Sequence, residues 1–187
     1  MANCCQVIEP VDPLSQDPAN LIHSFSRTLL VSSSSSTADV AVPTTLQISI
    51  EALENSQDCF EIDQPCTGHA VWFAAHNLSD FLQEYHDTCR LQSLQWQRPV
   101  RVLELGAGTG FCGLWLARML KNLQSKLPIA TMLLTDGDRD VVQLLERNCQ
   151  RNNLTDNDDA VNGVAVECRQ FAWGKEQAED LLQHDRG

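Results

Sequence analysis

The segment Pro99–Gly113 reads PVRVLELGAGTGFCG, and it decides the fold. An apolar run ends in Glu104-Leu105, and glycines follow at the alternate positions 106, 108 and 110. A segment compatible with a helix, Leu114–Leu120, comes directly after them. This order is typical of a buried parallel strand that leads through a tight turn into a helix. Glycine suits such a turn because the backbone bends sharply and must approach a ligand without a Cβ in the way. The stretch therefore predicts a site for an adenosine-containing cofactor.

The spacing of the glycines separates two classes of cofactor. The dinucleotide pattern G-x-G-x-x-G fails from Gly106, because Phe111 stands in place of the third glycine. It fits from Gly108, but only after the chain has already turned. The alternating G-x-G-x-G with Glu104 just before it resembles S-adenosylmethionine-dependent methyltransferases. A carboxylate there would repel a pyrophosphate, whereas the cationic, zwitterionic methionine end of S-adenosylmethionine tolerates one. The sequence thus favours S-adenosylmethionine over NAD.

Strand and helix patterns alternate after the glycine turn. Ile129–Leu134 is predicted as a strand ending in Thr135-Asp136, Asp138–Asn148 as a helix, and Val164–Phe171 as a third strand. Short connections between alternating strands and helices predict a parallel sheet with right-handed crossovers. We therefore expect an α/β, Rossmann-like fold with the ligand at the carboxyl ends of the strands. The apolar stripe of the predicted helix consists of Val141, Val142, Leu144, Leu145 and Cys149.

The chain before the glycine turn predicts a short β-hairpin and a helix. Apolar residues alternate with polar ones from Leu46 to Ile50, as in a half-buried strand, and Cys59–Ile62 is predicted as its antiparallel partner. Residues 1–44 are interpreted as a flexible, Ser- and Pro-rich leader in which Leu21–Leu30 could form a short helix, and residues 45–187 as the domain. After Gly68 an amphipathic helix is predicted. Its apolar stripe consists of Val71, Ala74, Ala75, Leu78, Phe81, Leu82 and Tyr85.

Composition narrows the classes of partner and compartment. The net charge of −12 and the pI near 4.6 argue against a nucleic-acid-binding surface and are compatible with a basic protein partner. No stretch has the length of a membrane span, and no secretory signal is visible at the amino terminus. The eight cysteines include no C-x-x-C pair and are interpreted as reduced thiols of a cytoplasmic or nuclear protein. Cys59, Cys66 and His69 fit no familiar zinc spacing, so no metal is expected.

Three side chains are candidates for contact with the cofactor. Asp136 ends the second strand, where a carboxylate can accept both hydroxyls of a ribose. The alternative is a charge at the start of the next helix, where Asp138 would serve equally well. Trp173, just after the third strand, could stack on adenine or pack in the core. Trp72 lies outside the apolar stripe of its helix, as an aromatic side chain that lines a pocket would.

These pieces together resemble the seven-β-strand protein-lysine methyltransferases of the methyltransferase-like group, over about residues 46–175. The resemblance is carried by GHAVWFAA at Gly68–Ala75, VLELGAGTGFCGLWLA at Val102–Ala117, the strand end Thr135-Asp136, and FAWG at Phe171–Gly174. It implies a class I methyltransferase fold, S-adenosylmethionine as cofactor, and a lysine side chain of a protein as methyl acceptor. Glu104 would then orient the methionine end. The residues expected at the cofactor are Trp72, Glu104, Gly106, Ala107, Gly108, Gly110, Asp136 and Trp173.

The chain departs from this family at two places. Phe73 follows the tryptophan where the family usually has an acidic residue or proline. Nothing after Gly174 resembles the Asp-x-x-Tyr motif that closes the pocket beside the methyl acceptor. We therefore expect a truncated sequence that carries only strands one to three of the parallel sheet, with poor stability and little or no activity. A small-molecule methyltransferase and an inactive cofactor-binding fragment stay open as alternatives, and no catalytic residue is assigned.

Overall fold

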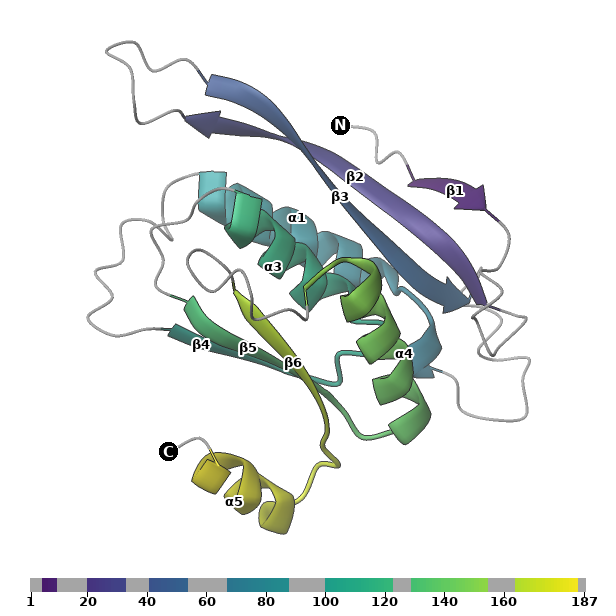
Figure 1. The fold of residues 1–187 in the computed structure, drawn as a ribbon, viewed down its shortest axis with the longest axis vertical. Helices are drawn as coiled ribbons and strands as arrows, with labels where there is room; N and C mark the ends of the chain where they lie inside the picture. The colour runs from purple at the N-terminus through teal and green to yellow at the C-terminus, as the bar shows by residue number, and fades with distance from the viewer. Residues whose placement is uncertain are drawn as a thin grey trace.

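The computed structural model describes residues 5–9, 20–32, 41–53, 67–87, 100–122, 129–154 and 164–184. Within these residues two three-stranded sheets lie on either side of a layer of helices (Figure 1). One sheet is antiparallel and the other is parallel. The fold is thus α/β, as the sequence predicts.

The parallel sheet carries the glycine turn. Its strands are β4 (Val100–Leu105), β5 (Ile129–Asp136) and β6 (Ala165–Gln170), in the order β4-β5-β6. Helix α3 (Phe111–Asn122) follows β4, and helix α4 (Arg139–Arg151) follows β5. Both strand pairings are parallel, which confirms the predicted alternation of strands and helices.

Helix α4 follows its sequence pattern closely. The Asp138 side chain accepts a hydrogen bond from the backbone N–H of Asp140 at 2.8 Å, so Asp138 is the N-cap. The helix then presents its apolar stripe to the sheet, where each side chain leaves water and stabilises the fold. The predicted stripe is confirmed, since all of its members are buried: Val141, Val142, Leu144, Leu145 and Cys149.

The antiparallel sheet differs from the predicted hairpin. Its strands are β1 (Cys5–Glu9), β2 (Asn20–Ser32) and β3 (Ala41–Leu53), and β3 pairs with β2. The strand that pairs with β3 is thus β2, and the partner predicted at Cys59–Ile62 lies outside the described residues. The prediction of a helix at Leu21–Leu30 is wrong, because these residues belong to strand β2.

Tertiary packing explains why β2 is a strand. The ring of Phe25 contacts that of Phe111 edge-on with centroids 4.7 Å apart, and it also contacts His76. In register, Phe25 stands opposite Ile48, whose side chain is buried. Pairing with β3 and burial of this ring outweigh local helix propensity. Parts of the predicted leader are therefore sheet, and the predicted boundary between residues 44 and 45 falls inside β3.

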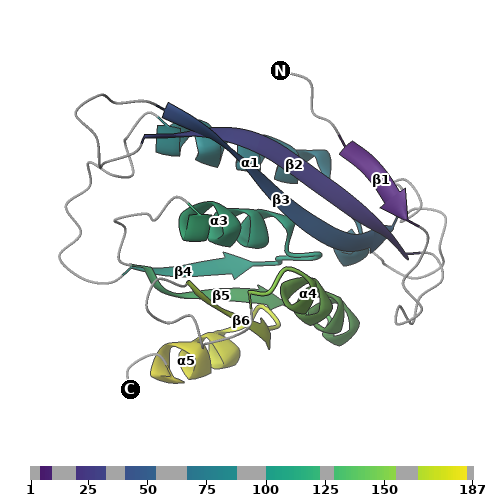
Figure 2. The same ribbon diagram turned by 45° about the horizontal axis from the view of Figure 1, so that its top comes forward.

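Helices α3 and α4 lie between the two sheets (Figure 2). Both helices contact β3 on one side and β5 on the other, and α4 also contacts β6. This layer holds the core, because each helix buries side chains toward both sheets. The largest fully buried apolar side chains are Leu46, Ile48, Ile50, Leu114, Trp115, Met119, Met132, Leu134, Leu144 and Leu145.

Two asparagines fasten α4 to the backbone of β3. The Asn148 amide accepts a hydrogen bond from the N–H of Glu51 at 2.7 Å and donates to the carbonyl of Glu51 at 3.1 Å. One helical turn later, the Asn152 amide makes the same pair of bonds with Ser49, at 2.9 and 2.7 Å. Ser49 and Glu51 are alternate residues of β3, so the two amides satisfy backbone groups that a neighbouring strand would otherwise satisfy.

The Glu51 side chain adds a charged contact to this junction. Its carboxylate is 1% exposed and accepts two hydrogen bonds from the Arg147 guanidinium, at 2.9 and 3.2 Å. Arg151 lies 3.6 Å from the second carboxylate oxygen. Burying a charged carboxylate is costly unless it is paired in this way. The ion pair therefore fixes which residue of β3 faces α4.

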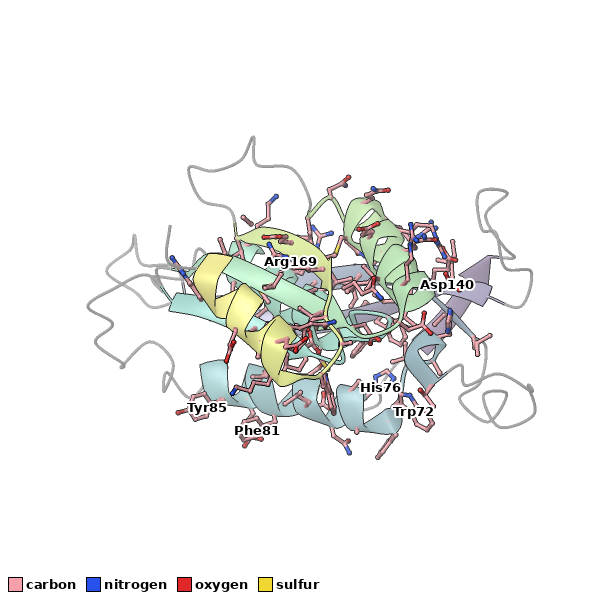
Figure 3. All side chains as sticks on the ribbon, turned by 90° about the horizontal axis from the view of Figure 1, so that it is seen from below. Trp72, His76, Phe81, Tyr85, Asp140 and Arg169 are labelled. Atoms are coloured by element: carbon pink, nitrogen blue, oxygen red, sulfur yellow. The ribbon has the colours of Figure 1, made fainter. Side chains whose placement is uncertain are left out.

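Helix α1 (Phe73–Asp87) is present as predicted, but its apolar stripe is only partly buried. Leu78 is 46% exposed and Phe81 is 58% exposed, so the predicted burial of these two residues is wrong. The helix instead packs against α3 through the small residues Ala75 and Ser79. Figure 3 shows Phe81 and Tyr85 on the outer side of α1, where their rings stack with centroids 5.8 Å apart.

Two short helical segments complete the described chain. A 3-10 helix, η2 (Thr67–His69), precedes α1. Helix α5 (Lys175–His184) follows β6 and lies on the side of the parallel sheet opposite α3 and α4 (Figures 1 and 2).

Replacing Asn148 with alanine should destabilise the fold strongly. The substitution leaves the buried backbone groups of Glu51 and the carbonyl of Thr109 without their partner, which costs about 3 kcal/mol of unfolding free energy. Urea unfolding followed by circular dichroism measures the loss. Gln150→Ala, at an exposed position of the same helix, is the matched control and should change little. Equal losses for the two variants would contradict the role given to Asn148.

Candidate cofactor-binding site

The turn between β4 and α3 takes a backbone conformation that requires glycine. Gly106, Gly108 and Gly110 have φ values of +67°, +57° and +81°. A Cβ at Gly108 would also lie 3.1 Å from the carbonyl oxygen of Gly68, and one at Gly110 would overlap the Leu145 side chain. Substitution would therefore combine backbone strain with steric conflict. The alternate glycines are needed for the shape of the turn itself.

Strand β5 holds this turn in place. The N–H of Ala107 donates to the carbonyl of Thr135 at 2.8 Å, and the N–H of Gly108 donates to Oδ2 of Asp136 at 3.0 Å. The other carboxylate oxygen of Asp136 accepts from the N–H of Asp138 at 3.1 Å. Asp136 thus connects the turn after β4 with the start of α4, so its carboxylate has a fixed orientation.

A cavity of about 590 Å³ lies at the carboxyl ends of β4 and β5. Its walls come from the glycine turn, η2, the start of α1 and the first residues of α4. This is the position that the parallel topology predicts for a ligand. Six of the eight predicted site residues line it: Trp72, Glu104, Gly106, Ala107, Gly108 and Asp136.

The other two predicted residues lie outside the cavity lining. Gly110 is the buried last glycine of the turn, and a Cβ there would meet the side chains of Leu145 and Leu114. Trp173 is 76% exposed, so the alternative that it packs in the core is wrong. Its ring nevertheless lies close to Gly106, because Cζ2 is 3.6 Å from where a Cβ would stand on that glycine. The N–H of Phe171 donates to the carbonyl of Asp136 at 2.7 Å, which holds this segment beside β5.

Trp72 has a fixed position at the edge of the cavity. Its indole N–H donates to the carbonyl of Thr67 at 2.8 Å, across the turn between η2 and α1. The residue is 36% exposed and lines the cavity. Figure 3 shows it at the end of α1, away from Phe81 and Tyr85. The Trp72 side chain thus forms part of the wall of the cavity.

Glu104 is the unusual charged group of the cavity. Burial raises the pKa of this carboxyl from its ordinary 4.5 to about 7, while a hydrogen bond from the backbone of Gly113 opposes the shift. Its Oε2 atom is buried and has no hydrogen-bond partner within the described chain. Burial and the nearby Glu104 charge also raise the pKa of Cys112 to about 11, so Cys112 is a neutral thiol. A cationic ligand group would satisfy the Glu104 carboxylate.

Some lining residues were missed by sequence reasoning. Gly68 was predicted as a break before the helix and as the first residue of the tryptophan motif, but not as a lining residue. A Cβ there would lie 2.7 Å from a methyl group of Val141. Because Gly68 has no Cβ, η2 can approach α4 closely and form one wall of the cavity. Asp138, predicted as an alternative to Asp136, caps α4 and lines the cavity as well. The sequence signal for Gly68 was its place at the head of the tryptophan motif.

The described residues contain no candidate metal cluster and no helix that could span a membrane. No group of three His, Cys, Asp or Glu side chains that could hold a metal ion occurs among the described residues, and Cys59 and Cys66 lie outside them. None of the helices in the described ranges has the length and apolar character needed to cross a membrane.

The Glu104→Gln substitution should alter how stability depends on pH. Because the folded-state pKa is raised to about 7, the folded protein binds a proton that the unfolded chain releases near pH 4.5. The contribution of Glu104 to the free energy of unfolding is fully present below pH 4.5 and is lost as the pH rises through about 7. Glutamine keeps the neutral shape at every pH. The variant should therefore gain stability relative to the wild type as the pH rises from 5 to 8, and urea unfolding at both pH values measures this gain. If the difference in unfolding free energy between the variant and the wild type were the same at both pH values, the raised pKa of Glu104 would be contradicted.

No curated protein matches the chain at a significant level. A family model described as "Lysine methyltransferase" matches residues 54–186, which include the glycine turn, the parallel sheet and all the lining residues of the cavity. Since the match covers well over half of the chain, the protein belongs to the lysine methyltransferase family.

Proposed function

We propose that the chain binds S-adenosylmethionine in the cavity at the ends of β4 and β5, as a protein-lysine N-methyltransferase. The observation that carries the proposal is the presence of Glu104 and Asp136 in one cavity, at the ends of neighbouring strands joined to the same glycine turn. Membership of the lysine methyltransferase family supports the reaction class.

The residues of the cavity fit the two ends of this cofactor. The buried Oε2 of Glu104, which lacks a partner in the described chain, suits the ammonium group of the methionine end. Each oxygen of Asp136 accepts one backbone N–H and keeps a second lone pair for a ribose hydroxyl. Two carboxylates in one cavity disfavour a pyrophosphate, which argues against NAD.

Methyl transfer requires the protein mainly to position the methyl donor and the lysine acceptor. Bound S-adenosylmethionine supplies a methyl group on a sulfonium, and a lysine amine must reach it in its neutral form and in line. Apolar residues such as Ala75, Leu78 and Phe111 line the same cavity and lower its polarity around the reacting groups. The net charge of −12 favours encounter with a basic segment of a protein substrate. We propose the cytoplasm or the nucleus as the compartment, in agreement with the cysteine content.

Isothermal titration with S-adenosylhomocysteine tests the binding half of the proposal, with NAD as control. We expect saturable binding of S-adenosylhomocysteine alone. Asp136→Ala should weaken it at least ~10-fold, because a charged hydrogen-bonding group that orders the turn is lost. Asp140→Ala, an exposed carboxylate in the first turn of α4 that does not line the cavity, is the matched control. Binding of NAD, or equal affinity in both variants, would overturn the assignment.

A second candidate is a cofactor-binding protein without transfer activity. It is favoured by Leu103 and Leu105, which are 49% and 50% exposed on the side of β4 opposite α3. Strand β4 is also an edge of the parallel sheet as far as the described residues define it. Exposed apolar side chains beside a free strand edge indicate a surface that an active enzyme would cover.

Methyl transfer separates the two candidates. With S-adenosylmethionine carrying a labelled methyl group, a protein-lysine methyltransferase labels lysine residues of proteins in a cell extract. Asp136→Ala should reduce the label at least ~10-fold, in step with its loss of affinity. Binding of S-adenosylhomocysteine without any label on protein supports the second candidate. Label on small molecules alone would instead indicate a small-molecule methyltransferase.

A further inference from the structure

Two cysteines meet away from the cofactor cavity, at the contact between α4 and β6. Their Sγ atoms are 3.2 Å apart, although the residues, Cys149 and Cys168, are separated by 19 positions in the chain. Cys149 is fully buried and Cys168 is half-buried, and neither forms a disulfide. Neither residue lines the cavity or has a part in the proposed methyl transfer.

The surrounding elements already bring the two sulfur atoms together. Helix α4 packs on β6, and Cys168 follows Val166 on the face of the sheet that this helix covers. A disulfide has an S–S distance of about 2.05 Å, so the sulfur atoms need to approach by only about 1 Å. A change of this size is within the range of small side-chain adjustments.

The two thiols differ in their access to solvent. The hydrogen bond with Cys168, burial and the Glu146 carboxylate raise the pKa of the Cys149 thiol. Cys149 therefore keeps its proton. Cys168 is the more exposed of the two residues, so a small oxidant is expected to reach it first.

We propose that Cys149 and Cys168 form a redox modification site, which hydrogen peroxide converts into a disulfide that joins α4 to β6. The Cys168 sulfur attacks a peroxide oxygen, the O–O bond breaks, and the leaving hydroxide takes up the proton of the Cys168 thiol to become water. The Cys168 sulfenic acid then condenses with the Cys149 thiol: the S–S bond forms, the S–O bond breaks, and a second water leaves with the thiol proton. Two thiols lose two electrons and the peroxide gains them.

The disulfide would connect two elements that flank the cavity. Val141, near the start of α4, lines it, and the segment after β6 holds Phe171, whose N–H binds the carbonyl of Asp136. The bond closes the chain between α4 and β6 and reduces the freedom of the unfolded state. For a loop of this length the midpoint of thermal unfolding should rise by ~5–10 °C.

Peptide mapping by mass spectrometry of the full chain tests the proposal. After treatment with hydrogen peroxide we expect a peptide pair linked through Cys149 and Cys168 that has lost two hydrogen atoms, and dithiothreitol should reverse it. Cys168→Ser should abolish the linked pair, as should Cys149→Ala. Cys112→Ser is the matched control and should leave the pair unchanged, because this thiol bonds to Ala75 on another helix.

If a variant fails to fold, peptide mapping and thermal unfolding of the wild-type chain still test the proposal. The linked pair together with a higher unfolding midpoint than in dithiothreitol supports the proposal. Over-oxidation of either cysteine without the link overturns it, as does a scrambled set of linkages among the eight cysteines.

Discussion

The side chain of Asn148 joins three parts of the chain that are far apart in sequence. From the middle of α4 it bonds both backbone groups of Glu51 in β3 and the carbonyl of Thr109 in the glycine turn. The residue is completely buried, so each of these polar groups depends on the others for a partner. The position of the antiparallel sheet and the shape of the turn are thus fixed by the same amide. Asn152 repeats the contact with β3 one helical turn later and sets the register.

The glycine turn is consequently held from two sides. Asn148 binds its carbonyl at Thr109 from the core, and Asp136 binds its N–H at Gly108 from the end of β5. A turn with three residues at positive φ has few ways to rearrange under both constraints. A ligand therefore meets a backbone that is already ordered, and less of its binding energy is lost in ordering the site. Glu104 is an unfavourable feature of the cavity by itself, since burial disfavours its charged form until a cation binds beside it.

Local sequence patterns were sufficient for the parallel half of the fold. The buried stripe of α4, its start near Asp138 and the strand end at Asp136 follow from local sequence patterns, which act over a few residues. The antiparallel sheet was not predictable in this way. Phe25 is ordered by Phe111 and Ile48, contacts that no local pattern reveals. The face of α1 was mispredicted for a similar reason, because Ala75 and Ser79 allow close approach to α3 and direct the larger Phe81 outward.

The exposed apolar surface and the cavity lie on different sides of the parallel sheet. Glu104 points to the α3 side of β4 and lines the cavity, whereas its neighbours Leu103 and Leu105 point to the other side. Covering those leucines would therefore add stability without changing the groups that face a cofactor. Cofactor binding in turn stabilises the fold only through mass action on the folded state. Affinity for the cofactor and the stability of the sheet edge are thus separate properties of this chain, and a weak edge is compatible with a well-formed cavity.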